Sequence, residues 1–171
     1  MKQTQYSMKS QDVVVLLKII ALNNDIWQQI PLAKSLKMSQ SEVSQSVARS
    51  KYAGLLDDSG KRVMRQVLMD FLQYGLAIVF PVKPGAVVRG IPTAHSAAPL
   101  NKDISSDEFY VWPFAKGNVR GHGITPLYAT VPQAALEDEQ LYAMLALADA
   151  LRVGKSREKN IAVQELKNRI W

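Results

Sequence analysis

The spacing of apolar residues near the N-terminus predicts two short helices in succession. A polar run at residues 23–25 interrupts the first apolar stretch and ends the helix expected over residues 10–22. Pro31 suits the first turn of a second helix over residues 31–37, because its ring fixes the backbone in a helical conformation. The inward-facing residues at helical spacing are Val13, Leu16, Leu17 and Ile20 in the first helix and Leu32, Ala33 and Leu36 in the second.

A third helix is marked by its capping residues. Ser39 stands three residues before Glu42, and this pair has the spacing of a capping box, in which each side chain bonds to the backbone N–H of the other residue. Val43 and Val47 supply a buried stripe along the helix. Gly54 follows near the end of the helix, after which we expect extended chain.

The rest of the chain alternates between helical and strand-like patterns, separated from the first three helices by a turn signal at residues 57–60. The expected elements are a helix over 61–74, a β-hairpin over 76–90, irregular chain over 91–108, short strands and loops over 109–114 and 119–131, and helices over 139–152 and 156–170. We therefore predict an α+β fold in two parts, a DNA-binding domain over residues 1–90 and a mixed β and helical region over residues 91–171 for interaction or dimerisation.

The positive charge of the chain is concentrated at its two ends. The net charge is +6, made of +4 in residues 1–56, +2 in 57–100, −4 in 101–151 and +4 in 152–171. A basic segment attracts polyanions, of which nucleic acid is the commonest partner. Charge alone is equally compatible with a solvated basic surface, so the sequence pattern has to distinguish the two.

Several kinds of chemistry are excluded or lack support. The absence of cysteine excludes disulfides, zinc–thiolate sites and thiol catalysis. His95 and His122 have no further ligands at metal-binding spacing, and no residue set indicates an enzyme or a cofactor. The first 12 residues lack the apolar core of a signal peptide, and the aliphatic runs at 13–17 and 76–80 are too short to span a membrane. We therefore expect a cytoplasmic protein.

The segment 32–56 has the order of a helix-turn-helix. Val43 and Val47 would hold its second helix against the other two and leave the opposite face free for the major groove, where Gln pairs with adenine and Arg with guanine. Lysines on either side would contact phosphates. The candidate DNA-contacting residues are Lys34, Lys37, Ser39, Ser41, Ser44, Gln45, Arg49 and Lys51.

This segment resembles the DNA-reading part of MarR-type and related winged-helix transcription regulators. The matching residues are Leu32, Ala33, Leu36, Met38, Ser39, Val43, Arg49, Ala53, Gly54 and Leu55. The resemblance implies a winged helix-turn-helix that binds double-stranded DNA and regulates transcription in bacteria.

The chain departs from this family pattern at three places. Ser50 stands where a leucine is usual, which weakens packing late in the helix. Lys37 replaces the small residue or glycine that is common before the turn, so the geometry of the turn is open. The family wing follows Leu56 directly, whereas here a helical pattern intervenes. The wing is therefore absent, displaced, or made by the hairpin over residues 76–90, and in the last case Lys83 and Arg89 would be its phosphate contacts.

A second resemblance lies in the tail. Residues 147–166 are similar to the C-terminus of bacterial winged-helix proteins that accompany nucleotidyltransferase-type toxins. This likeness implies an alternative function, a protein-interaction module such as a neutralising or adaptor partner of an enzyme or toxin. The basic residues of the tail could bind phosphate or an acidic partner, or be an ordinary solvated helix face; they are Arg152, Lys155, Arg157 and Lys159.

We also expect a homodimer, because one short recognition helix reads few bases and regulators commonly double it. The pairing surface must be apolar and must leave the third helix free. Three stripes offer one, although each of their residues could equally belong to the core: Val13, Leu17 and Ile20; Val67 and Phe71; and Leu141, Leu145, Leu166 and Ile170.

Overall fold

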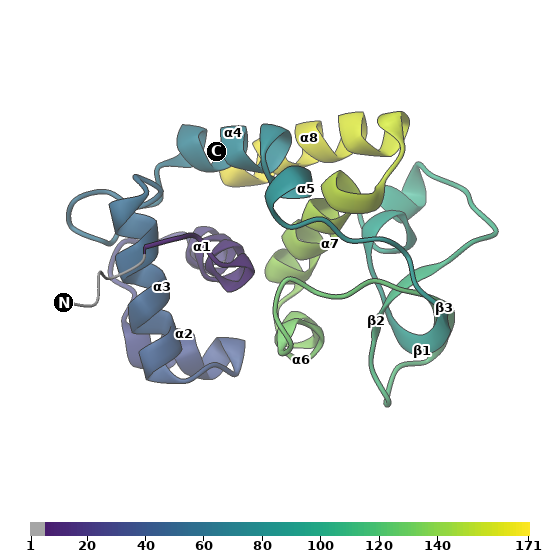
Figure 1. Ribbon diagram of the computed structural model, residues 1–171, viewed down its shortest axis with the longest axis horizontal. Helices are drawn as coiled ribbons and strands as arrows, with labels where there is room; N and C mark the ends of the chain where they lie inside the picture. The colour runs from purple at the N-terminus through teal and green to yellow at the C-terminus, as the bar shows by residue number, and fades with distance from the viewer. Residues whose placement is uncertain (1–5) are drawn as a thin grey trace.

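The computed structural model describes residues 6–171 and combines helices with a small sheet (Figure 1), compatible with the predicted α+β class. The N-terminal stretch considered for a signal peptide lies partly outside the described residues, which begin at Tyr6. Within residues 6–171, none of the helices is both long enough and apolar enough to cross a membrane.

The first three helices are α1 (Ser10–Leu22), α2 (Gln29–Leu36) and α3 (Gln40–Tyr52), as the sequence predicts to within two residues. α1 lies in the middle of the molecule, packed against α2, α3 and α7, and its residues 12–20 are all buried. A helix that is apolar around its circumference has to be enclosed in this way. Its charged exceptions, Asp12 and Lys18, each have an ionic partner on another segment.

The predicted capping box of α3 is confirmed. The Glu42 backbone N–H donates to the Ser39 Oγ at 3.1 Å, and the Ser39 backbone N–H donates to the Glu42 Oε2 at 2.8 Å. Lys37 closes α2 in the left-handed region, with φ 57° and ψ 34°. The small residue of the family pattern would take this conformation more readily.

The chain after α3 differs from the prediction. Leu56 forms an isolated antiparallel bridge with Val63, so the fourth helix, α4 (Arg65–Tyr74), begins four residues later than expected. The β-hairpin predicted over 76–90 is wrong, because its first arm is a helical turn, α5 (Leu76–Val79). A short apolar run has the same pattern in a strand and in a buried helical turn. Leu76 is fully buried, and α5 packs against α7.

The sheet has three strands: β1 (Val87–Pro92), β2 (Tyr110–Pro113) and β3 (Val119–Gly123). β1 pairs antiparallel with both of the others, and β2 pairs parallel with β3, which closes the strands into a small barrel. A Cβ atom on Gly90 would lie 2.0 Å from the Trp112 carbonyl oxygen, so this close approach requires glycine.

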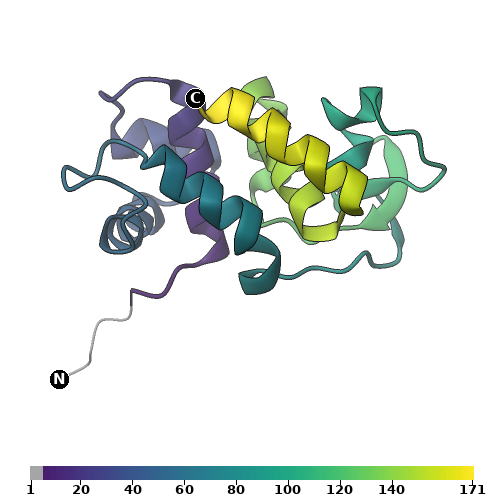
Figure 2. The same cartoon turned by 90° about the horizontal axis from the view of Figure 1, so that it is seen from above.

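The C-terminal helices complete the core. They are α6 (Val131–Leu136), α7 (Glu139–Val153) and α8 (Ser156–Ile170), and two short 3₁₀ turns, η1 (Ala94–Ser96) and η2 (Leu100–Lys102), precede them. Asp138 caps the N-terminus of α7, since the Leu141 N–H donates to the Asp138 carboxylate at 3.0 Å. α4 and α8 lie side by side on one surface of the molecule (Figure 2).

A buried carboxylate ties α7 to the sheet. The Asp149 Oδ2 accepts hydrogen bonds from the Thr93 hydroxyl at 2.7 Å and from the Trp112 indole N–H at 2.6 Å, and Oδ1 accepts from Arg152 at 2.9 Å. Burial raises the pKa of Asp149 even though these donors and the Arg152 charge oppose it. The Arg152 side chain of the basic tail is therefore buried in an ion pair with Asp149.

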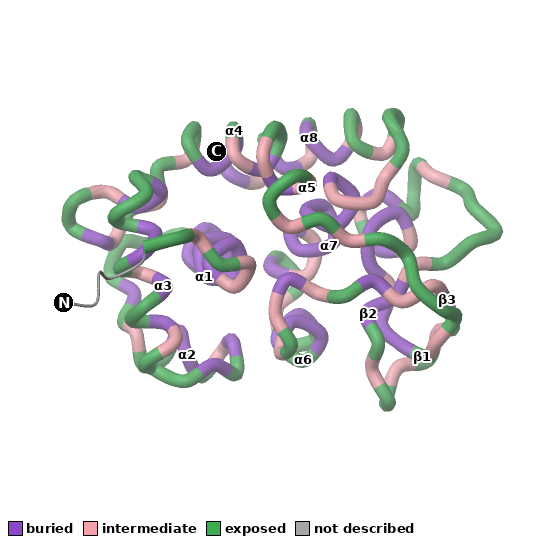
Figure 3. The backbone as a smooth tube through the Cα atoms, in the orientation of Figure 1, coloured by how far each residue is buried: buried purple, intermediate pink, exposed green. Residues whose placement is uncertain are grey.

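One apolar core runs through both predicted parts of the chain. Residues before and after position 90 belong to the same buried cluster, and Figure 3 shows buried backbone in α1 and in α7 alike. Two of the three stripes considered for dimerisation are inside it: the α1 stripe and the α7–α8 stripe are at most 5% exposed. Only the α4 stripe, with Val67 and Phe71, reaches the surface.

Candidate nucleic-acid interface

α3 exposes a polar face made of uncharged side chains that can hydrogen bond. Ser41, Ser44 and Gln45 are exposed on one side, while Val43 and Ser46 on the other side are fully buried. The Gln45 side-chain amide donates to the Ser41 Oγ at 3.1 Å, so both groups lie on the solvent side. Donors and acceptors of this kind are what base edges in the major groove recognise.

Arg49 is not on this face. It is 6% exposed, and its guanidinium donates two hydrogen bonds to the Asp12 carboxylate, at 2.9 and 2.8 Å. Asp12 is fully buried in α1. The expectation that Arg49 projects toward bases is wrong. A buried carboxylate is costly unless a cation pairs with it, and Arg49 is the cation that pairs with Asp12. The pairing partner lies 37 residues away, so helical periodicity alone gave no sign of it.

The lysines expected to contact phosphates differ in their surroundings. Lys34 on α2 and Lys51 on α3 are exposed, and among the described residues 6–171 neither has an acidic partner within salt-bridge distance. Lys37 is exposed too, but its Nζ lies 2.9 Å from the Glu137 carboxylate. Ser39 is exposed while its side chain caps α3. Two unpaired cations therefore flank the polar face of α3.

A segment from the C-terminal region holds the turn between α2 and α3. The Thr130 hydroxyl donates to the Leu36 carbonyl oxygen at 2.7 Å, and the Tyr128 hydroxyl donates to the Glu42 carboxylate. The Tyr128 hydrogen bond lowers the pKa of Glu42, and the Ser39 backbone N–H lowers it further. The sequence carried no signal for this support, since the contacting residues lie 86 and 94 positions apart.

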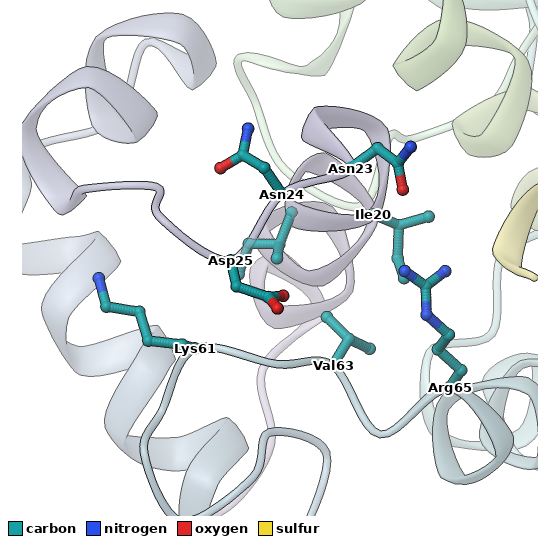
Figure 4. Close-up of a pocket in the computed structure, with 8 residues that line it drawn as sticks. Ile20, Asn23, Asn24, Asp25, Lys61, Val63 and Arg65 are labelled. Carbon is teal, nitrogen blue, oxygen red and sulfur yellow. The ribbon is translucent and has the colours of Figure 1, made fainter.

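Two hydrogen bonds with Trp27, in the segment between α1 and α2, fix the turn that follows α3. The Trp27 indole N–H donates to the Lys61 carbonyl oxygen at 2.8 Å, and the Lys61 Nζ donates to the Trp27 carbonyl oxygen at 2.6 Å. A polar pocket of about 210 Å³ lies between this turn and the end of α1, where Asn23 and Asp25 line it with Lys61 and Arg65 (Figure 4). Arg62 on the turn remains exposed, in a surface ion pair with Asp25 at 3.0 Å.

Lys83 and Arg89 are placed far from α3. Arg89 lies on β1, and the sheet occupies the end of the molecule opposite to α3 (Figure 1). Lys83 lies in the segment that joins α5 to β1. Because the hairpin expected at 76–90 does not form, neither residue can extend a wing from the helix-turn-helix.

Other candidate chemistry is dispersed. The His95 ring is buried and bonds through Nε2 to the Glu108 carbonyl oxygen at 2.7 Å, while His122 lies on β3. Among residues 6–171, no three His, Asp or Glu side chains gather as metal ligands would. Trp112 belongs to the core and is 1% exposed.

The basic tail residues other than Arg152 lie at the surface. Lys155, Arg157 and Lys159 are exposed at the start of α8.

Comparison of the chain with protein-family models, with curated proteins and with solved structures found no match.

Proposed function

We propose that this protein binds double-stranded DNA by inserting α3 into the major groove, and that it regulates transcription. The observation that carries the proposal is the uncovered polar face of α3, with Ser41, Ser44 and Gln45 exposed between Lys34 and Lys51. Small hydroxyls and an amide read base edges, and the lysines supply sequence-independent attraction to phosphates.

The support behind α3 favours this use. A reading helix has to be held rigidly, and α3 is fixed by its capping box, by the buried Arg49–Asp12 pair and by the Tyr128 contact. The Arg49–Asp12 pair is buried, so this anchor leaves the exposed face of α3 free. Arg49 thus changes role in the proposal, from base reader to positioning residue.

The winged-helix form of the motif is also a proposal. The Leu56–Val63 bridge follows α3, at the place where the family pattern has its wing. It supports a wing made of residues 57–62. Arg62 is the exposed cation of that turn and takes the place of Lys83 and Arg89 as the wing contact.

The test is selection of bound fragments from random duplex DNA, followed by affinity measurements on the selected site and on an unrelated duplex. Gln45→Ala and Ser44→Ala should each cost about 1–3 kcal/mol on the selected site and little on the unrelated duplex. Gln140→Ala, an exposed glutamine on α7, is the matched control and should change neither affinity. If no sequence is enriched, or if the α3 variants bind the selected site as the wild type does, the assignment to α3 is wrong.

A further inference from the structure

α4 and α5 carry an apolar stripe with a regular spacing, exposed at every position except the half-buried Phe71. Met64, Val67, Phe71, Tyr74 and Ile78 follow one another at intervals of three, four, three and four residues. This alternation is the spacing with which one helix packs lengthwise on another. With Val79, these residues are called the α4–α5 face below.

The stripe is separate from the side of α4 that enters the core. Leu68, Met69 and Leu72 are at most 1% exposed and pack inside the protomer. In contrast, Tyr74 is 70% exposed and Ile78 is 79% exposed. Figure 3 shows the corresponding exposed stretches of α4 and α5. α4 is thus apolar on two sides, of which the protomer covers one.

Contacts within the face make it continuous. The Phe71 ring lies over Gly75, where a Cβ atom would come within 2.9 Å of it, and packs edge-on against Phe80 at a centroid distance of 6.3 Å. Phe71 therefore bridges the break between α4 and α5. Met64, Val67 and Val79 are 42%, 41% and 51% exposed on either side of it.

We propose that the α4–α5 face is the contact between two copies of this chain, paired helix to helix about a two-fold axis. A seam of this spacing fits a helix with the same spacing, and a second copy supplies one. Charge favours the same partner: from Met64 to Val79 the charged residues are Arg65 and Asp70, whose charges cancel, although the chain carries +6. Two copies can therefore meet there without cationic repulsion.

The size of the face suits self-association. Aromatic side chains bury ~150–250 Å² each and aliphatic ones less, so five exposed residues and the half-buried Phe71 present on the order of 500 Å². Two such faces together bury about 1,000 Å², near the lower limit for a specific interface. The expected dimer is therefore concentration-dependent. Its residues lie outside α3, so this inference does not rest on DNA binding.

Another exposed apolar site serves as the comparison. Ile26 is 85% exposed and Ile30 is 52% exposed, but they do not continue into a three-four repeat along one helix. A partner helix would find no seam there. Ile26 is therefore a surface isoleucine matched to Ile78.

Sedimentation equilibrium of the full chain over a wide range of concentrations tests the proposal. The wild type should pass from 19.0 kDa toward twice that mass as concentration rises. Ile78→Asp and Val67→Asp, both at exposed positions, should remain monomers with an unchanged circular dichroism spectrum. Ile26→Asp should dimerise as the wild type does. A wild type that is monomeric throughout, or a dimer lost in Ile26→Asp and kept in Ile78→Asp, overturns the proposal.

Cross-linking gives a second measurement that does not depend on weakening the dimer. Because the chain has no cysteine, a single introduced thiol reports one position. Phe71 lies at the centre of the five-residue repeat, so Phe71→Cys should yield a covalent dimer with a short bis-maleimide at concentrations where Ile26→Cys does not. Equal yields from the two variants, or none from Phe71→Cys, contradict a contact through this face.

Discussion

Lys37 holds the turn before α3 in a backbone conformation that suits glycine better. Its φ of 57° places it in the left-handed region, and its N–H still closes α2 by bonding to the Lys34 carbonyl oxygen. A side chain in this region costs about 1–2 kcal/mol because Cβ approaches the carbonyl oxygen. In return, a cation is placed at the α2–α3 turn.

Replacing Lys37 tests this backbone cost. Lys37→Gly should be more stable to urea than Lys37→Ala by about 1 kcal/mol, because both lose the side-chain charge and only alanine keeps the Cβ. Lys34, inside α2, is the matched control, and there alanine should exceed glycine by about 1 kcal/mol. The same order at both positions would contradict a left-handed Lys37.

At the scale of elements, the pair Arg49–Asp12 joins α3 to α1. Removing one partner leaves a buried charge, so Arg49→Met or Asp12→Ala alone should lower the free energy of unfolding by about 3–5 kcal/mol. The double variant should lose less than the sum of the two. A double-mutant cycle by urea unfolding measures this coupling.

The exposed pair Lys37–Glu137 provides the control cycle. Its partners are 39% and 59% exposed, so its coupling should stay below about 1 kcal/mol. A coupling as small for Arg49–Asp12 would mean that the two residues act independently, and Arg49 would then lose its positioning role.

The cap of α3 depends on pH through Glu42. Its pKa is lowered below 4.5, chiefly by the Tyr128 hydroxyl, so the folded state favours the carboxylate. The stability that this contributes is present above pH 4.5 and is lost as pH falls through the lower, folded-state pKa. Tyr128→Phe should raise the Glu42 pKa toward 4.5 in an NMR titration of the side-chain carboxyl. Tyr74→Phe, an exposed tyrosine on α4, should leave it unchanged.

Elements with a local signal could be predicted from the sequence, and those fixed by distant contacts could not. α1, α3 and α7 have helical spacing and, for α3 and α7, capping residues that the structure uses. α5 depends on packing against α7, which a short apolar run does not reveal, whereas the Leu56–Val63 bridge is local and closes the turn expected at residues 57–60. In the site, the exposed face of α3 followed from periodicity, whereas the position of Arg49 depended on Asp12.

At the scale of the whole molecule, the chain has one core, and its exposed cations are spread over the surface, so two groups of them can be compared. Lys34 and Lys51 flank α3, while Lys155 and Lys159 lie at the start of α8, near the opposite end of the molecule (Figure 1). Deleting the basic tail would not separate these groups, because α8 buries Ala162, Leu166 and Ile170 in the core, and so would unfold the protein. Charge has to be removed side chain by side chain.

The salt dependence of DNA affinity distinguishes local contacts from overall charge. Lys34→Gln with Lys51→Gln lowers the net charge from +6 to +4, and so does Lys155→Gln with Lys159→Gln. Each phosphate contact contributes about 0.9 to the slope of log affinity against log salt, so losing two contacts at α3 should reduce the slope by about 1.8. The α8 pair should leave the slope unchanged, because those lysines face away from DNA bound at α3. Equal reductions in both variants would mean that net charge governs binding, and a reduction only in the α8 variant would place the DNA on that helix.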